Sequence, residues 1–363
     1  MDQKFSMFPL DKIATRWGGL LDGSFDDAIL PFEVFPGVYI ENVASLIPAN
    51  EFDYCKAELG TNLIEHLQHI KYGIIHRFPT LEIDASSGKI KCEPEISEDS
   101  KTLVQQAVAC LRLVRPFVQY VQFLGGSVGN DGSLNNIHFD HPIPFLSSLS
   151  NQTVMAIRTQ DVQDLKSVFP QFRTAMEGNY WKFRMSVDMF QSGYFQQTHW
   201  KLRFFMWTAA LEALFTSHSS PQHRGSLVAK ERVKHLLGAT TLIYPAGELS
   251  QYEPDPHLTV ENVIDEIYCL RNHIAHGDKV PDYYFQTTGR TGLNGPINKL
   301  ETLSEAISSI VRRSLLTILK TNLLVNFQDG AASESYFSSL GLTKSKLEQK
   351  AKVGGTVQFT CPS

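Results

Sequence analysis

Two hydrophobic patterns divide the chain. Up to about residue 160, short apolar runs alternate with turn-forming residues, which is typical of strands and short helices. From residue 161 onward, apolar residues recur every three or four positions over long stretches, the spacing of one face of a helix. The pattern predicts an α+β chain with a mixed α/β domain at 1–160, an all-α bundle at 161–330 and a polar C-terminal tail at 331–363.

The elements of the first domain are short, and turn residues separate them. Alternating apolar and polar positions predict a β-hairpin, and a longer amphipathic stretch predicts one substantial helix. In chain order, the predicted elements are strands and loops over 1–60, helix within 51–69, hairpin strands 71–83 and 89–96, a helix from 98 to about 123, and a flexible glycine-rich loop at 125–133.

The second domain is predicted to be helical almost throughout. Its candidate helices are 161–177, 180–196, 199–217, 226–237, 259–276 and 296–326. Two long connections, 238–257 and 277–296, interrupt them, and loops of this length are often functional or face a partner. In the tail, one short helix is expected at 344–352.

Composition narrows the class of protein. The formal net charge is −5, with the acidic excess confined to residues 1–178 and a slightly basic second half. This charge distribution excludes a role in coating nucleic acid. Any contact with nucleic acid would need a local basic site in the second half of the chain.

The chain also lacks the signals of export and of membrane insertion. It begins without an apolar signal segment, and no apolar run reaches the roughly 20 residues of a membrane span. The five cysteines are odd in number and widely spaced, so neither a disulfide framework nor a zinc knuckle is expected. We predict a cytoplasmic protein without membrane contact.

Candidate chemistry concentrates at the end of the helix predicted at 259–276. Thr259 is a suitable N-cap, and Gly277 is placed to end the helix. Four apolar residues form a narrow stripe that should face the core: Val263, Ile267, Leu270 and Ile274. Asn272 and His276 share the opposite face, and Arg271 lies at the border of the core face.

A carboxylate is predicted inside the preceding apolar helix. Residues 204–215 are apolar on nearly every side of the helix, which indicates burial, yet Glu212 lies among them. A lone buried carboxylate is costly, so Glu212 is expected to pair with Arg271 or Arg232.

The segment from Arg271 to His276 resembles the R-x4-H motif of the HEPN (higher eukaryotes and prokaryotes nucleotide-binding) superfamily, with polar Asn272 after the arginine. The Glu212-bearing helix and Gly277 resemble the Apea-like branch, which is associated with abortive infection and antiviral (phage) defence. The similarity covers about residues 179–330. It implies a homodimer formed through the helical bundle, with two copies of Arg271 and His276 around one cleft.

The resemblance further implies a toxin-like, metal-independent endoribonuclease that needs no cofactor. RNA supplies its own nucleophile, the 2′-OH, so His276 would accept or relay the proton and Arg271 would bind the phosphate. Asn272 would orient the phosphate or the histidine. The first domain would sense a phage-derived or regulatory trigger. Asp278 replaces the tyrosine that a partner enzyme modifies in some members, which argues against that mode of control.

Other interpretations remain open at this stage. The segment could be a non-catalytic HEPN module that binds nucleotide, RNA or a protein partner, or a purely structural dimerisation domain. Cations also suit the negative end of a helix without any catalytic role. His273 falls on a different face and is expected at a rim or interface.

Three other motifs are weak candidates. His138, Asp140 and His141 are acceptable metal ligands, but the run is short and the sequence has no matching second set of ligands. The glycine-rich segment at 125–129 is no P-loop, because no Lys-Ser/Thr follows it. Arg312 and Arg313 are expected to face solvent.

Overall fold

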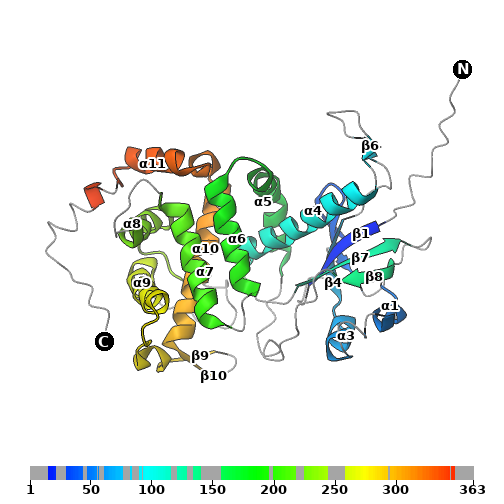
Figure 1. The fold of residues 1–363 in the computed structure, drawn as a ribbon, viewed down its shortest axis with the longest axis horizontal. Coiled ribbons are helices and arrows are strands. Elements are labelled where there is room, and N and C mark those ends of the chain that lie inside the picture. The colour runs from blue at the N-terminus through cyan, green and yellow to red at the C-terminus, as the bar shows by residue number, and fades with distance from the viewer. Residues whose placement is uncertain are drawn as a thin grey trace, which may run out of the picture. The chain divides into compact units, whose positions relative to one another are not determined.

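The structure is a computed structural model, and it divides the chain into two compact units, Met1–Pro170 and Gln171–Ser363 (Figure 1). The first unit is built around a sheet and the second around helices, which confirms the α+β class. The described residues are 15–21, 30–43, 47–54, 56, 61–76, 82–83, 90–91, 93–115, 121–128, 134–139, 157–195, 199–217, 225–243, 258–292, 295–343 and 345–347.

A six-stranded antiparallel sheet forms the first unit. Its strands follow the order β2-β3-β4-β1-β7-β8. Their bounds are β1 Thr15–Leu21, β2 Phe32–Phe35, β3 Val38–Asn42, β4 Tyr72–His76, β7 Val121–Val128 and β8 Leu134–Phe139. Helix α4, Glu93–Val114, packs against β1 and β4, and two shorter helices, α1 Ala49–Tyr54 and α3 Thr61–Gln68, contact each other.

The hairpin predicted at 71–83 and 89–96 is only partly correct. Two short strands, β5 Glu82–Ile83 and β6 Ile90–Lys91, do pair with each other. The start of the predicted hairpin instead forms β4, which pairs with β1 and β3. Tyr72, Gly73, Ile74 and Ile75 of β4 are all buried, so both faces of this strand are covered, which a local hairpin would not achieve.

The helix predicted to reach residue 123 ends earlier. α4 stops at Val114, just before Arg115 and Pro116, because proline disfavours helix in the residue before it. Gly125 and Gly126, predicted to lie in a loop, pair instead with Trp17 and Arg16 of β1. The remainder of that predicted loop, 129–133, lies outside the described residues, as do Asp140 and His141 of the candidate metal run.

The second unit is a helical bundle. Five predicted helices are confirmed: α5 Thr159–Glu177, which crosses the boundary between the units, α6 Trp181–Phe195, α7 Trp200–Phe215, α8 Gly225–Leu237 and α9 Val260–His276. The sixth is broken into α10 Lys299–Lys320 and a 3-10 turn, η4 Leu324–Phe327. Asn322 adopts a positive φ of 56° after α10, the left-handed conformation that commonly ends helices.

Helix α7 is the centre of the bundle. It contacts α6, α8, α9 and α10, and Figure 1 shows it among them. Phe204, Trp207, Leu211 and Leu214 on it are buried, which agrees with the apolar composition of its sequence. A helix held by four neighbouring helices is a fixed support for side chains that contact it.

Close packing of α6 on α7 depends on Gly193. A Cβ added there would lie 2.3 Å from Nε1 of Trp207, whose indole donates a hydrogen bond to Phe190 O at 3.1 Å. We expect Gly193→Ala to lower the free energy of unfolding by about 1–3 kcal/mol, measured by urea denaturation. The neighbouring Ser192→Ala is the control, and equal stability of the two variants would contradict this packing.

The connection at 277–296 is more structured than predicted. It contains a 3-10 turn, η3 Asp282–Phe285, and a two-stranded hairpin of β9 Thr287–Gly292 with β10 Gly295–Asn298. Asn298 then caps α10 through a reciprocal capping box with Glu301.

The predicted polar tail begins with a helix that packs on the bundle. Phe337 of α11, Gly330–Ser339, is fully buried and contacts Phe215 at the end of α7. Its neighbour Glu334 pairs with Arg232 of α8, whose side chain is 0% exposed. Residues 345–347 are also helical, and the rest of the short helix predicted there lies outside the described residues.

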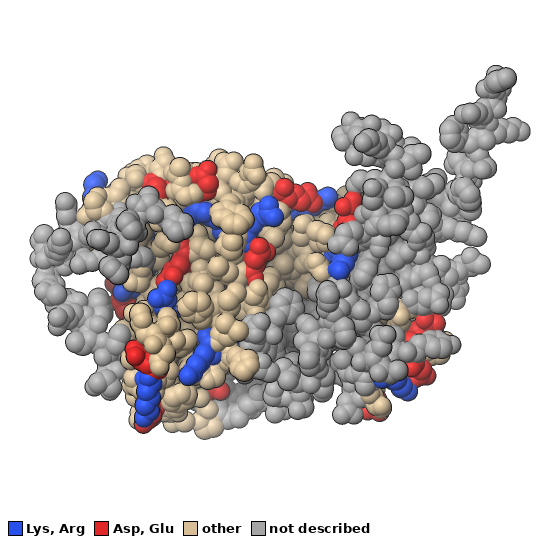
Figure 2. Space-filling model, viewed as in Figure 1, with Lys and Arg blue, Asp and Glu red and all other residues tan. Residues whose placement is uncertain are grey.

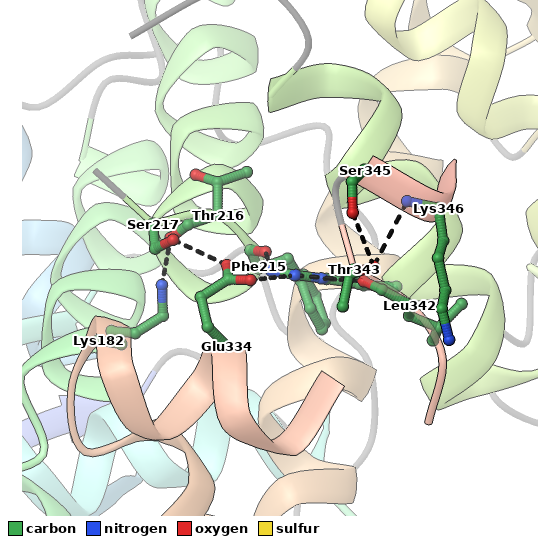
Figure 3. A network of polar contacts seen from close by, with 10 residues as sticks. Lys182, Phe215, Thr216, Ser217, Glu334, Leu342, Thr343, Ser345 and Lys346 are labelled. Atoms are coloured by element: carbon green, nitrogen blue, oxygen red, sulfur yellow. Dashed lines mark hydrogen bonds and ion pairs between the residues drawn. The ribbon is translucent and has the colours of Figure 1, made fainter. Parts of the chain in front are cut away.

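Arg232 connects three segments of the second unit. Its guanidinium group donates to Glu334 Oε1 and Oε2 at 2.8 and 2.7 Å, to Phe215 O and to Leu342 O. Figure 3 shows Glu334, Ser217 and Lys182 meeting beside the end of α7. Burial, together with the charge of Arg232, lowers the pKa of Lys182 to about 8.

The expectation that Arg312 and Arg313 face solvent is wrong. Arg312 is buried and Arg313 is half-buried, with Arg313 donating to Leu242 O, because both guanidinium groups turn into the bundle. Cys269 of α9 is disulfide-bonded, and the expectation that the chain has no disulfide framework stays a prediction. Among the described helices, none is long and apolar enough to cross a membrane.

Candidate functional site

Helix α9, which carries the R-x4-H motif, begins and ends at the predicted residues. The hydroxyl of Thr259 accepts a hydrogen bond from Asn262 N at the N-terminus of α9. At the other end, Gly277 is left-handed with φ 72°, and Gly277 N and Asp278 N donate to the carbonyls of Ile274 and His273. This is the Schellman arrangement, so the position of His276 at the last turn is fixed by the backbone.

The faces of α9 agree with the sequence pattern. Val263, Ile267 and Leu270 are buried, and Ile274, one turn from the end, is half-buried. Asn272 and His276 are exposed on the other side. Both polar side chains are therefore open to a ligand or to another molecule.

Arg271 lies at the border and pairs with Glu212 of α7. Its Nη2 donates to Glu212 Oε2 at 3.0 Å, and each side chain is 25% exposed. Its Nη1 donates to Asn272 Oδ1 at 3.3 Å, and its Cζ lies 5.9 Å from the centroid of the Phe205 ring. Of the two partners considered for Glu212, the structure selects Arg271, since Arg232 is occupied by Glu334.

The pair is electrostatically costly. Burial raises the pKa of Glu212 above its ordinary value, and the opposing attraction of Arg271 does not cancel this effect. Tyr268 is fully buried and lies near both charges. Burial, and after it the charge of Glu212, raise the pKa of Tyr268, while the charge of Arg271 opposes this rise. Glu212 and Arg271 therefore form a pair in which either partner alone would be poorly solvated.

His273 does not join this group. It is half-buried, and neither ring nitrogen has a hydrogen-bond partner within the described part of the chain. It is less exposed than Asn272 and His276. Its assignment to a rim or interface stays a prediction.

Two side chains that lie beside the Glu212–Arg271 pair, Phe205 and Tyr268, were not predicted to do so, and Tyr268 is a neighbour of the pair rather than part of the site. Phe205 precedes Glu212 by seven residues, which places both on one face of α7. Tyr268 precedes Arg271 by three residues, so it is a neighbour on α9. These spacings would have identified both once the Glu212–Arg271 pair was assumed.

The surface around the bundle is of mixed charge. Figure 2 shows Lys and Arg interspersed with Asp and Glu on the described surface of this face, without a broad basic area. Asp278, next to the site in sequence, is exposed.

A double-mutant cycle can measure the Glu212–Arg271 pair. We expect Glu212→Ala and Arg271→Ala to be non-additive in the free energy of unfolding, with a coupling energy of about 0.5–3 kcal/mol. The exposed pair Arg173–Glu177 of α5, whose side chains are 36% and 51% exposed, is the control and should couple by less than about 0.5 kcal/mol. Additivity at Glu212 and Arg271 would show that the two side chains do not interact in solution.

Comparisons with protein-family models, with curated proteins and with solved structures find no match to this chain.

Proposed function

We propose that the second unit is a metal-independent endoribonuclease of the HEPN type, with Arg271, Asn272 and His276 at its site. One observation carries the proposal. Arg271 is fixed between two helices, while Asn272 and His276 stand exposed at the same helix end. A held cation beside an accessible imidazole is what cleavage of RNA by its own 2′-OH requires.

Each residue has a distinct role in this reaction. His276 accepts the proton of the attacking 2′-OH or relays it to the leaving oxygen. Arg271 binds non-bridging phosphate oxygens and stabilises the charge that develops on them. Asn272, hydrogen-bonded to Arg271, orients the arginine or the phosphate.

A second copy of the chain is part of the proposal. α7 carries a partly exposed apolar stripe at helical spacing, formed by Leu202, Met206, Ala209 and Ala213. Glu212 and Phe205, the partners of Arg271, lie at its border. Pairing of two such stripes would bring two sites together. A Met206→Glu variant that remained as dimeric as the wild type would contradict this arrangement, as would a monomeric wild type.

The biological setting proposed is phage defence or a toxin-like stress response. Met1–Pro170 would sense the trigger or restrain the nuclease. These statements rest on the resemblance of the motif and of the Glu212-bearing helix.

The test uses purified protein and a single-stranded RNA, with and without EDTA, beside the same oligonucleotide made as DNA. We expect RNA cleavage that persists in EDTA, leaves 2′,3′-cyclic phosphate ends and spares DNA. Arg271→Lys keeps a charge opposite Glu212 but loses the fork of donors, and it should lower kcat/KM by about 10- to 100-fold. Absence of cleavage, dependence on metal or an unaffected lysine variant would overturn the proposal.

A further inference from the structure

Three side chains hold the guanidinium group of Arg271. Glu212 accepts from Nη2 and Asn272 accepts from Nη1, while the ring of Phe205 lies at 5.9 Å from Cζ. Nε is buried and has no acceptor within the described part of the chain. Since a guanidinium group has five N–H donors, one on each Nη has no acceptor among the described residues and is available to a ligand.

Of the two hydrogen-bond acceptors of Arg271, Glu212 is the one that lies on another helix. Glu212 belongs to the central helix α7. At the end of this helix, the backbone N and the hydroxyl of Thr216 both donate to the backbone carbonyl of Glu212, at 2.9 and 2.6 Å. Asn272, in contrast, is an exposed side chain on the same helix as Arg271. The hydrogen bond to Glu212 therefore ties the guanidinium group of Arg271 to a second helix of the bundle.

We propose that Glu212 is a positioning residue for Arg271, which directs the two remaining Nη donors toward two oxygens of one phosphodiester. The identity of the ligand rests on the proposed function. Two N–H groups on one plane match two oxygens of a phosphate, so a small rotation of the guanidinium group breaks the match. The accepting oxygen of Glu212 fixes that rotation, and its negative charge is not needed for this purpose.

This distinction between geometry and charge makes the role testable. With a fluorescein-labelled single-stranded RNA, we expect Glu212→Ala to lower kcat by about 10- to 100-fold with KM unchanged. Glu212→Gln, whose amide oxygen can accept the same hydrogen bond, should retain most of the wild-type kcat. An alanine variant as active as the wild type, or a glutamine variant as impaired as alanine, would overturn the positioning role.

Tyr268→Phe is the matched control. It lies against the same pair but has no hydrogen-bond partner among the described residues, so its kcat should equal that of the wild type. A loss of kcat there equal to that of Glu212→Ala would attribute the effect to general disturbance of the site, against the proposal.

A second readout does not depend on cleavage. In protein labelled with 15N-arginine, the Nη resonances of Arg271, assigned with Arg271→Lys, should be separate in the wild type and in Glu212→Gln because rotation is restricted. They should average in Glu212→Ala. Averaged resonances in the wild type would overturn the positioning role, even if RNA is cleaved. Separate resonances without any RNA cleavage would support it while the proposed function fails.

Discussion

Replacing His276 with alanine is expected to lower RNA cleavage by about 100- to 10,000-fold, the range for loss of a general acid–base group. His276 is exposed at the last turn of α9, with its backbone fixed by Gly277. Because its side chain takes no part in the core, the free energy of unfolding should change by less than about 0.5 kcal/mol. The loss should therefore appear in kcat, measured at saturating RNA, without loss of fold.

His235 provides the control. It is also an exposed histidine in the last turn of a helix, here α8, and it lies outside the proposed site. His235→Ala should cleave RNA at the wild-type rate. If both variants retained activity, His276 would have no catalytic role. If both lost it equally, the effect would not be specific to the site.

The largest effect on stability is expected for Glu334→Ala, at about 3–5 kcal/mol. Arg232 is 0% exposed and Glu334 is 30% exposed, and the carboxylate accepts two of the guanidinium hydrogen bonds. Removing Glu334 leaves a buried positive charge whose remaining partners among the described residues are two carbonyls and the Phe337 ring, none of them an anion, which costs far more than the net value of the intact pair. Urea denaturation at neutral pH would measure the loss.

The exposed pair Lys279–Asp282, with side chains 82% exposed, is the comparison. Asp282→Ala should cost no more than about 1 kcal/mol. A similar small cost for Glu334→Ala would mean that Arg232 reaches water or another acceptor when its partner is removed.

The Glu334 contribution should also depend on pH. The hydrogen bond from Arg232 holds the pKa of Glu334 below its ordinary value of 4.5 despite partial burial. The unfolded chain therefore binds a proton more readily, so this stabilisation is complete above pH 4.5 and is lost as pH falls through the folded-state pKa. Glu334→Ala should show a shallower acid dependence of unfolding than the wild type.

Periodicity was sufficient to predict α9 and its surroundings. Thr259, Gly277 and the apolar stripe gave the ends and the faces of the helix, because capping and amphipathicity are local properties. The pairing of Glu212 was predicted only as a choice between two arginines. Selecting Arg271 required knowing that Glu334, far along the chain, occupies Arg232.

The wrong structural predictions have a common cause. In each, a partner distant in sequence determines the local structure or the direction of the side chain. β4 entered the centre of a sheet rather than a local hairpin, since β1 and β3 were available to it. The glycines at 125 and 126 joined a strand because β1 pairs with them. Arg313 turned inward because the carbonyl of Leu242 accepts its hydrogen bond. Local propensity does not contain this information.

The Arg232 contacts also bear on how the protein is made. Glu334 follows Arg232 by 102 residues, and Leu342 follows it by 110. At bacterial to eukaryotic rates of translation, the ribosome needs about 5–20 s to add such a stretch. Until then, α8 in the nascent chain cannot bury Arg232 with its native partners. The bundle around α7 is therefore expected to close late in synthesis, and its nascent form should remain a substrate for chaperones over that interval.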